Sequence, residues 1–248
     1  MDDTLQGKVA LVTGAARRVG AAIARRLHAA GANVVIHYRG AESEAIQLEA
    51  QLNAMRKGSA LRLKGDLLAP IAPQALVGAA LERWNRLDLL VNNASTFYAT
   101  AVGEIEAVQW DELIGSNLRA PLFLAQTAAP HLAAVRGSIV NLADIHAERP
   151  LKGYLVYSVA KAGIAALTRA LALELAPAVR VNAVAPGAIA WPEDGQFDPA
   201  ERERIVATTP LQRIGTPEDI AQAVYYLATA PFVTGHLLAI DGGRSLTL

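Results

Sequence analysis

The stretch Lys8-Val9-Ala10-Leu11-Val12-Thr13-Gly14-Ala15-Ala16-Arg17-Arg18-Val19-Gly20 sets the pattern for the rest of the chain. An apolar run, Lys8 to Val12, leads into a glycine turn, and helical periodicity follows from Gly20 to Ala30. A strand that turns through glycine into a helix presents backbone N–H groups and the positive helix end, which together bind a dinucleotide pyrophosphate. The match to G-x-G-x-x-G is incomplete, so this interpretation needs support from elsewhere in the chain.

Short apolar runs alternate with helical patterns along the whole sequence. The later runs are Asn33–Ile36, Ala60–Leu63, Leu87–Val91, Ser138–Leu142, Val179–Val184 and Leu237–Ile240. Apolar strands separated by helices are typical of a parallel sheet covered on both faces, with right-handed connections. The sequence therefore predicts an α/β fold: a single doubly wound parallel sheet (Rossmann fold) with helices on both faces. No repeat or linker divides residues 1–248, so we expect one domain.

The composition argues against several classes of protein. The 23 basic and 23 acidic side chains balance, so neither nucleic acid nor an anionic membrane is the expected partner. There is no Cys, and the five His residues have no metal-ligand spacing, so we expect no metal. We find neither a signal-peptide pattern nor an apolar run of the ~18 residues that a membrane span needs. These features predict a cytoplasmic protein.

Basic residues occur at two positions where a nucleotide would bring negative charge. Arg17 and Arg18 stand at the expected start of the first helix, where the helix dipole disfavours a cation by ~0.3–1 kcal/mol. An anion in the turn would explain both, although Arg17 could also extend into water. After the second strand comes His37-Tyr38-Arg39. An acid there typically holds the ribose 2′-hydroxyl of NAD, whereas Arg suits the 2′-phosphate, so we predict NADPH/NADP+ as cofactor.

Small polar residues follow the next two strands. Asp66 comes after the third strand and lies either near the adenine or in a turn. Asn93-Ala94-Ser95-Thr96-Phe97 follows the fourth, at the edge where ligands bind in this architecture. Phe97 is either a stacking surface for a flat ligand or an anchor for its loop. Asn117 falls within a helical pattern, where it would contact buried water or backbone.

Tyr157 and Lys161 are four residues apart at the start of a long helical pattern, so both project from one helix face. A free phenol has a pKa near ~10 and is a poor acid at neutral pH. An ammonium beside it favours the phenolate, so we expect Lys161 to lower the pKa of Tyr157 and make it a usable proton donor.

Together these residues resemble the short-chain dehydrogenase/reductase family along the whole chain. The matching pieces are Thr13-Gly14 with Gly20, Asn92-Asn93-Ala94, Asn117, Tyr157 with Lys161, Pro186-Gly187, Thr234-Gly235 and Asp241-Gly242-Gly243. The resemblance implies NAD(P)-dependent hydride transfer with Tyr157 as proton donor. It also implies that Lys161 holds the nicotinamide ribose and that Asn117 anchors a water of the proton relay.

Two departures from the family pattern are informative. Arg18 replaces the second glycine of the turn, and Asp144 replaces the usual serine thirteen residues before Tyr157. With His37-Tyr38 and Asn-Ala-Ser-x-Phe, they are similar to pteridine reductases, which use NADPH to reduce dihydropterins, dihydrofolate or oxidised pterins. A carboxyl group can accept the N–H donors of a pterin edge or pass a proton, whereas a serine mainly polarises a carbonyl oxygen. The other interpretation of Asp144 is a turn residue.

The resemblance implies a full set of site residues, with Asp144, Tyr157, Lys161 and Asn117 as the catalytic group. The residues implied in cofactor binding are Gly14, Arg18, Val19, Gly20, His37, Tyr38, Arg39, Asp66, Asn93, Ala94, Ser95, Tyr157, Lys161, Pro186 and Gly187. Those implied in substrate binding are Arg18, Ser95, Phe97, Asp144, Tyr157 and Trp191.

Two later segments concern the substrate and self-association. Residues at about 188–210 are rich in Pro, Gly and polar side chains and predict a mobile substrate loop, in which Trp191 lines the site or pins the loop. The helix after Tyr157 is rich in Ala and Gly. These small residues either pack on their own sheet or let helices of neighbouring subunits approach. Because the resembled family forms tetramers through this helix, we expect a homotetramer.

The leading hypothesis is an NADPH-dependent pteridine reductase acting on a small pterin or folate. The alternative within the same fold is a carbonyl reductase of 3-oxoacyl thioesters or small ketones, which serine at position 144 would have favoured. A non-catalytic NADP-binding regulatory protein is the alternative from another class, and the intact Asn117, Tyr157 and Lys161 argue against it.

Overall fold

The computed structural model describes residues 5–191 and 197–248. Within them, seven strands form one parallel sheet in the order β3-β2-β1-β4-β5-β6-β7. The strands are β1 (Val9–Val12), β2 (Asn33–Tyr38), β3 (Ala60–Lys64), β4 (Leu89–Asn92), β5 (Ser138–Leu142), β6 (Arg180–Pro186) and β7 (Leu237–Ile240). The predicted doubly wound α/β fold is confirmed.

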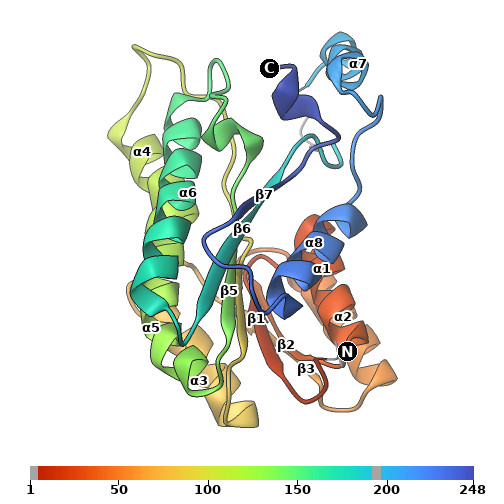
Figure 1. Ribbon diagram of the computed structural model, residues 1–248, viewed down its shortest axis with the longest axis vertical. Coiled ribbons are helices and arrows are strands. Elements are labelled where there is room, and N and C mark those ends of the chain that lie inside the picture. The colour runs from red at the N-terminus through yellow and green to blue at the C-terminus, as the bar shows by residue number, and fades with distance from the viewer. Residues whose placement is uncertain (1–4, 192–196) are drawn as a thin grey trace.

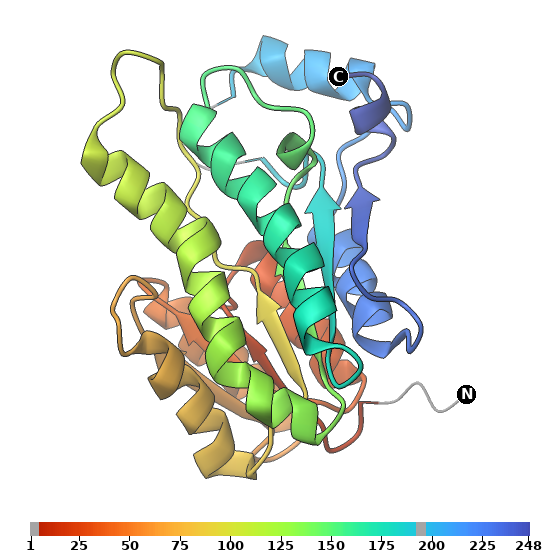
Figure 2. The same cartoon turned by 60° about the vertical axis from the view of Figure 1, so that its left-hand side comes forward.

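Helices cover both faces of the sheet (Figure 1). One layer consists of α1 (Arg18–Ala29), α2 (Glu42–Met55) and α8 (Pro217–Thr229). The other consists of α3 (Ala72–Trp84), α5 (Ala120–Ala134) and α6 (Leu155–Leu175). The shorter α4 (Ala107–Ile114) continues into α5 through the π-helical turn Gly115–Arg119. Figure 2 shows α7 (Pro199–Thr208) and the C-terminus beyond the carboxyl ends of β6 and β7.

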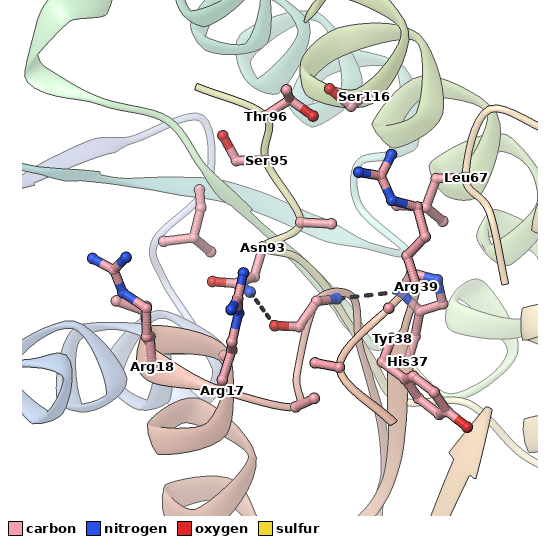
Figure 3. A pocket seen from close by; sticks show the side chains of 18 of the residues that line it. Arg17, Arg18, His37, Tyr38, Arg39, Leu67, Asn93, Ser95, Thr96 and Ser116 are labelled. Carbon is pink, nitrogen blue, oxygen red and sulfur yellow. Dashed lines mark hydrogen bonds between the residues drawn. The ribbon is translucent and has the colours of Figure 1, made fainter. Parts of the chain in front are cut away.

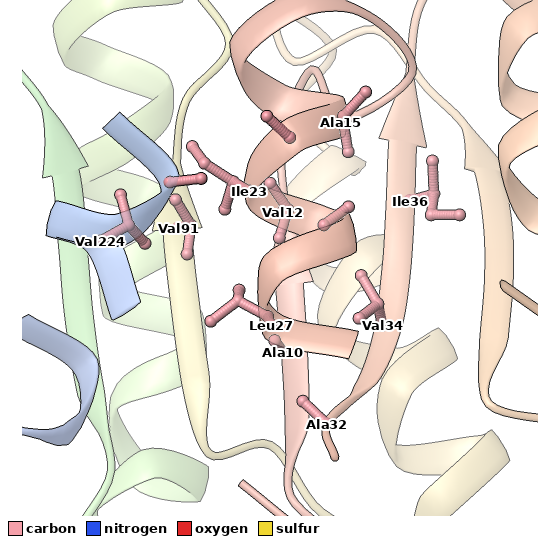
Figure 4. Close-up of a cluster of buried hydrophobic side chains, with 14 of the residues drawn as sticks. Ala10, Val12, Ala15, Ile23, Leu27, Ala32, Val34, Ile36, Val91 and Val224 are labelled. Atoms are coloured by element: carbon pink, nitrogen blue, oxygen red, sulfur yellow. The ribbon is translucent and has the colours of Figure 1, made fainter. Parts of the chain in front are cut away.

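Alternate residues of the strands supply the two cores because successive side chains of a strand point to opposite faces. Ala10 and Val12 of β1 pack under α1, where Ile23 and Leu27 are fully buried (Figure 4). Val9 and its alternating neighbours face the layer of α3 and α5. Both sets are buried, which explains why the strands read as continuous apolar runs rather than alternating ones.

The strand order reverses between β1 and β4. The chain builds β1, β2 and β3 outward in one direction, then crosses back so that β4 pairs with the other side of β1. At such a switch point the loops from neighbouring strands turn opposite ways and leave a crevice outside the carboxyl ends. The turn after β1 and the loop after β4 therefore face one another across it.

Three local features differ from the sequence expectation. His37 and Tyr38 are the last residues of β2 rather than residues that follow it. The predicted loop at 188–210 contains a helix, α7, because Asp198 caps it by accepting the Glu201 N–H at 2.8 Å and Pro199 suits its first turn. Residues 192–196 of that loop lie outside the described residues.

Helix α6 is long and apolar, and its small residues divide between two faces. Ala160, Ala165 and Ala172 are buried within the chain, whereas Ala162 and Ala166 are exposed. By length and composition alone α6 could cross a membrane, but half of its apolar window is buried inside the fold. Part of the small-residue pattern thus serves the chain's own packing, and the homotetramer stays a prediction.

Candidate active site

One cavity of about 680 Å³ opens at the carboxyl edge of the sheet (Figure 3). Its wall contains every residue that the sequence implied in cofactor binding, together with Asp144. The structure therefore gathers side chains from eight separate stretches of sequence into one place. Those stretches are 14–20, 37–44, 66–68, 93–96, 116, 142–161, 186–187 and 189.

The turn after β1 is packed too tightly for side chains at two positions. Gly14 has φ 60°, a conformation that favours glycine. A Cβ on Gly20 would overlap the Gly14 carbonyl oxygen and lie 2.7 Å from Asn93 Nδ2. Asn93 holds this arrangement by donating from Nδ2 to the carbonyls of Thr13 and Gly14, at 2.8 and 3.0 Å. The loop after β4 is thus fastened to the turn after β1.

His37 fastens the same turn from the other side (Figure 3). Its Nδ1 accepts the Gly14 N–H at 3.2 Å, and its Nε2 lies 3.1 Å from the Gly65 carbonyl. Because an N–H only donates and a carbonyl only accepts, His37 is the neutral Nε2–H tautomer. Burial lowers its pKa, opposed by the Gly65 bond and the charge of Asp66. His37 is therefore a positioning residue for the turn.

Arg17, Arg18 and Arg39 line the cavity at the turn and beside the end of β2 (Figure 3). Arg18 has φ 50°, and its Nη2 donates to the Ala190 carbonyl at 2.5 Å, joining the turn to the loop after β6. Within the described residues, none of the three arginines forms an ion pair. The cavity wall thus offers cationic groups to an anionic ligand.

Tyr157 and Asp144 meet at the other end of the cavity. The Tyr157 hydroxyl donates to Asp144 Oδ2 at 2.7 Å, and Asp144 Oδ1 accepts the His146 N–H at 2.8 Å. Burial and the Asp144 carboxylate raise the pKa of Tyr157 well above its ordinary value. The expectation that Lys161 lowers this pKa is therefore wrong for the free chain, because desolvation and the neighbouring negative charge outweigh the cation.

Lys161 lies one helical turn beyond Tyr157 and is 3% exposed. Its Nζ donates to the Leu142 carbonyl at 2.9 Å and lies 5.5 Å from the centre of the Tyr157 ring. Burial lowers the pKa of Lys161 to about 8, opposed by the charge of Asp144. At neutral pH the side chain is charged but close to losing its proton.

Asn117 lies in the π-helical turn rather than in a regular helix, and its side chain does not line the cavity. Both N–H bonds of its amide are used, by the carbonyls of Thr96 and Leu113, each at 2.9 Å. Its Oδ1 accepts the Ser95 hydroxyl at 2.6 Å. Asn117 therefore positions the loop after β4, and its part in a water relay stays a prediction. Such π turns often mark functional sites.

Phe97 and Trp191, predicted to contact the substrate, do not line the cavity. Phe97 stacks on Tyr154 with ring centres 4.7 Å apart and meets the edge of Tyr157 at the same distance. Trp191 packs 6.0 Å from Phe197. Aromatic neighbours attract both rings away from the open space, so of the two interpretations of Phe97 the loop anchor describes this structure.

Sequence reasoning missed several wall residues. They are Gly40, Ala41, Glu44, Leu67, Leu68, Thr96, Ser116, Leu142, Ala143 and Ile189. Most are small or apolar and carry no signal of their own. Glu44 is an exception, since an acid shortly after Arg39 could have been noticed as part of the same wall.

A family model described as enoyl-(acyl carrier protein) reductase matches residues 14–245. Pteridine reductase 1 of Leishmania tarentolae is 38% identical, and the alignment covers 96% of each chain. The chain belongs to the short-chain dehydrogenase/reductase family. Another relative is a putative ketoacyl reductase of granaticin polyketide synthesis from Streptomyces violaceoruber, 38% identical over 98% of each chain. A third is 3beta-hydroxysteroid dehydrogenase 1 of Eggerthella lenta, 35% identical over 99% of this chain and 97% of the relative.

Short-chain dehydrogenases and reductases are oxidoreductases that use NAD(P)H, and the cavity of this member fits that cofactor. Two glycines keep the turn free of side chains where a pyrophosphate approaches a helix N-terminus. Arg17, Arg18 and Arg39 supply positive charge along the same wall. The residues that would hold the cofactor run from this turn to Lys161, Pro186 and Gly187.

Gly20→Ala should damage the turn because the new methyl group would overlap the Gly14 carbonyl. We expect a loss of about 1–3 kcal/mol in the free energy of unfolding and NADPH affinity at least tenfold weaker. Gly40→Ala is the matched control, since Gly40 lines the same cavity and its Cβ would meet nothing within 4 Å. Denaturation and NADPH fluorescence titration measure both. Equal behaviour of the two variants would contradict the packing argument.

Lys161→Met should stabilise this reductase at neutral pH. Because the pKa of Lys161 falls from 10.5 to about 8 on folding, its charged form opposes folding below pH 8. That penalty disappears as pH rises from 8 to 10.5, and it is at most about 3 kcal/mol, reduced by the lost bond to Leu142. Urea denaturation should show a gain at pH 7 that shrinks by pH 9.5. A variant less stable than the native chain at pH 7 would refute the assignment.

Proposed function

We propose that this chain is an NADPH-dependent pteridine reductase that transfers hydride to a dihydropterin, dihydrofolate or oxidised pterin with Tyr157 as proton donor. The observation that carries the proposal is the 2.7 Å hydrogen bond from the Tyr157 hydroxyl to Asp144 Oδ2 on the cavity wall. A carboxylate occupies the place where most of the family has serine. The likeness to pteridine reductase 1 over 96% of each chain supports the same conclusion.

The protein must supply a proton and a surface for a nitrogen-rich ring. Bound NADPH would supply the hydride, which adds to the carbon of a ring C=N bond while a proton goes to the nitrogen. The raised pKa of Tyr157 keeps its hydroxyl protonated at neutral pH, so a proton is always present at the cavity wall. The Asp144 carboxylate, oriented by the His146 N–H, can accept the ring's N–H donors or pass the Tyr157 proton onward.

Lys161 acts from below on both groups. Its charge, held at the Leu142 carbonyl, lies on the same helix face as Tyr157. It offsets the negative charge that Asp144 brings into the buried site, so the phenol's proton is less costly to release than Asp144 alone would make it. In this proposal Lys161 also binds the nicotinamide ribose, as the family resemblance implies.

The proposed preference for NADPH rests on Arg39, which lines the cavity immediately after β2. A guanidinium and a phosphate form charge-assisted hydrogen bonds worth about 1.5–3 kcal/mol. Arg39→Asp should therefore lower kcat/KM for NADPH at least tenfold and leave or raise that for NADH. The test is kcat/KM for both cofactors in both proteins. Equal values in the native protein would overturn the preference.

The alternative is a carbonyl reductase of 3-oxoacyl thioesters or small ketones. It is favoured by the likeness to a putative ketoacyl reductase, which is as high in identity as that to the pteridine reductase. Parallel assays of NADPH oxidation with dihydrobiopterin, dihydrofolate and an acetoacetyl thioester separate the two. Preference for the thioester would replace the pteridine proposal with this one.

Asp144→Ser should lower kcat/KM for dihydropterin roughly 10²-fold or more, as loss of a proton-transfer group typically does. NADPH affinity and the fold should persist, since the Asp144 side chain bonds only Tyr157 and the His146 N–H among the described residues. Weak reduction of simple ketones should appear, because serine is the residue usual in the family. Native-level pterin turnover in the variant would show that Asp144 is only a turn residue.

A further inference from the structure

Glu44 places a negative charge in the arginine-rich part of the cavity. It lies in the first turn of α2 and lines the same wall as Arg17 and Arg39. The Ser43 hydroxyl donates to Glu44 Oε2 at 2.8 Å, which fixes the direction of the carboxylate. Glu44 also borders a smaller cavity of about 280 Å³ between α1 and α2, so it stands where the two cavities adjoin.

The carboxylate is ionised and not neutralised by a direct partner. Its own backbone N–H and the Ser43 hydroxyl donate to it, and with the charge of Arg17 they lower the pKa of Glu44. Over the described residues, Glu44 forms no ion pair within 4.0 Å. Nothing in the turn after β1 or at the end of β2 requires an acid here, and the proposed pterin chemistry does not use one.

We infer that Glu44 is a specificity-determining residue at the adenosine end of the cofactor, where its carboxylate opposes a 2′-phosphate and accepts a ribose 2′-hydroxyl. This inference rests on the proposed NADP(H) function. In dinucleotide-binding folds an acid roughly 20 residues past the glycine turn binds that hydroxyl, and an Arg accommodates the phosphate. This chain carries both on one wall, with the acid supplied by α2 instead of by the end of β2. It therefore moderates the preference for NADPH and admits NADH as a slower cofactor.

The sign of the effect follows from charge alone. A 2′-phosphate brings up to two negative charges beside Arg39, and Glu44 repels them while competing for the attraction of Arg17. Since the site is open to solvent, the repulsion is worth roughly a three- to tenfold change in affinity and is screened within about 10 Å at 0.1 M salt. A ribose hydroxyl carries no charge and can donate to the carboxylate.

The test measures binding without turnover. Calorimetric Kd values for adenosine 2′,5′-bisphosphate and for 5′-AMP report the adenosine end alone, in the native protein, Glu44→Gln and Glu42→Gln. We expect Glu44→Gln to bind the bisphosphate roughly three- to tenfold more tightly and AMP no more tightly, with the gain shrinking between 50 and 500 mM salt. Kd values for NADP+ and NAD+ should shift in the same directions.

Glu42→Gln is the matched control. Glu42 occupies the same helix turn and its loss changes the net charge equally, but it pairs with Lys64 at 3.3 Å and does not line the cavity. Its bisphosphate affinity should stay within about twofold of native, as for a screened surface charge. Equal gains in the two variants, or an unchanged ratio of bisphosphate to AMP affinity in Glu44→Gln, would overturn the inference. Native protein that binds AMP more tightly than the bisphosphate would instead contradict the proposed NADPH preference, whatever the variants do.

Discussion

The buried hydrogen bond between Tyr157 and Asp144 is the constraint on which the rest of the site depends. The sheet fixes one partner, because Asp144 follows β5, and α6 fixes the other in its first turn. Lys161 comes one turn later on the same face and is tied to the end of β5 through the Leu142 carbonyl. Ionisable groups persist in such a dry position only when each has a hydrogen-bond partner. The fold therefore has to hold α6 and β5 in register for the chemistry to exist.

Much of this arrangement could be predicted because it follows from periodicity and topology. Apolar runs located the strands, and parallel strands carry their carboxyl ends to one edge, so polar residues after each strand had to converge. The turn from Gly14 to Gly20 and Arg39 were placed correctly on that reasoning. His37 shows its limit: its place next to the turn was expected, but its bridge from Gly14 to Gly65 depends on the spacing of three neighbouring strands.

The features that escaped prediction depend on side-chain direction and on the balance of opposing electrostatic effects. Phe97 sits in the predicted loop, yet Tyr154 and Tyr157 offer it a better partner than open space does. Asn117 lies in the predicted segment, but the π-helical turn directs its amide to carbonyls of its own chain. The spacing of Tyr157 and Lys161 gave the pair correctly and the direction of the phenol's pKa incorrectly. Spacing reports proximity and says nothing about burial, which dominates here.

Arg18 connects the two ends of the cleft. Its φ of 50° and that of Ala190, 42°, lie in the left-handed region, which costs non-glycine residues about 1–2 kcal/mol each. A glycine at position 18, as the family pattern has, would adopt this backbone without that cost. The hydrogen bond from Arg18 to the Ala190 carbonyl offsets part of the strain and fastens the loop after β6 to the turn that opens α1. One of five guanidinium N–H groups makes that bond, and the others remain for the phosphate side of the cavity. The residue that departs most from the family pattern thus couples the turn that receives phosphate to the loop beside the reacting groups.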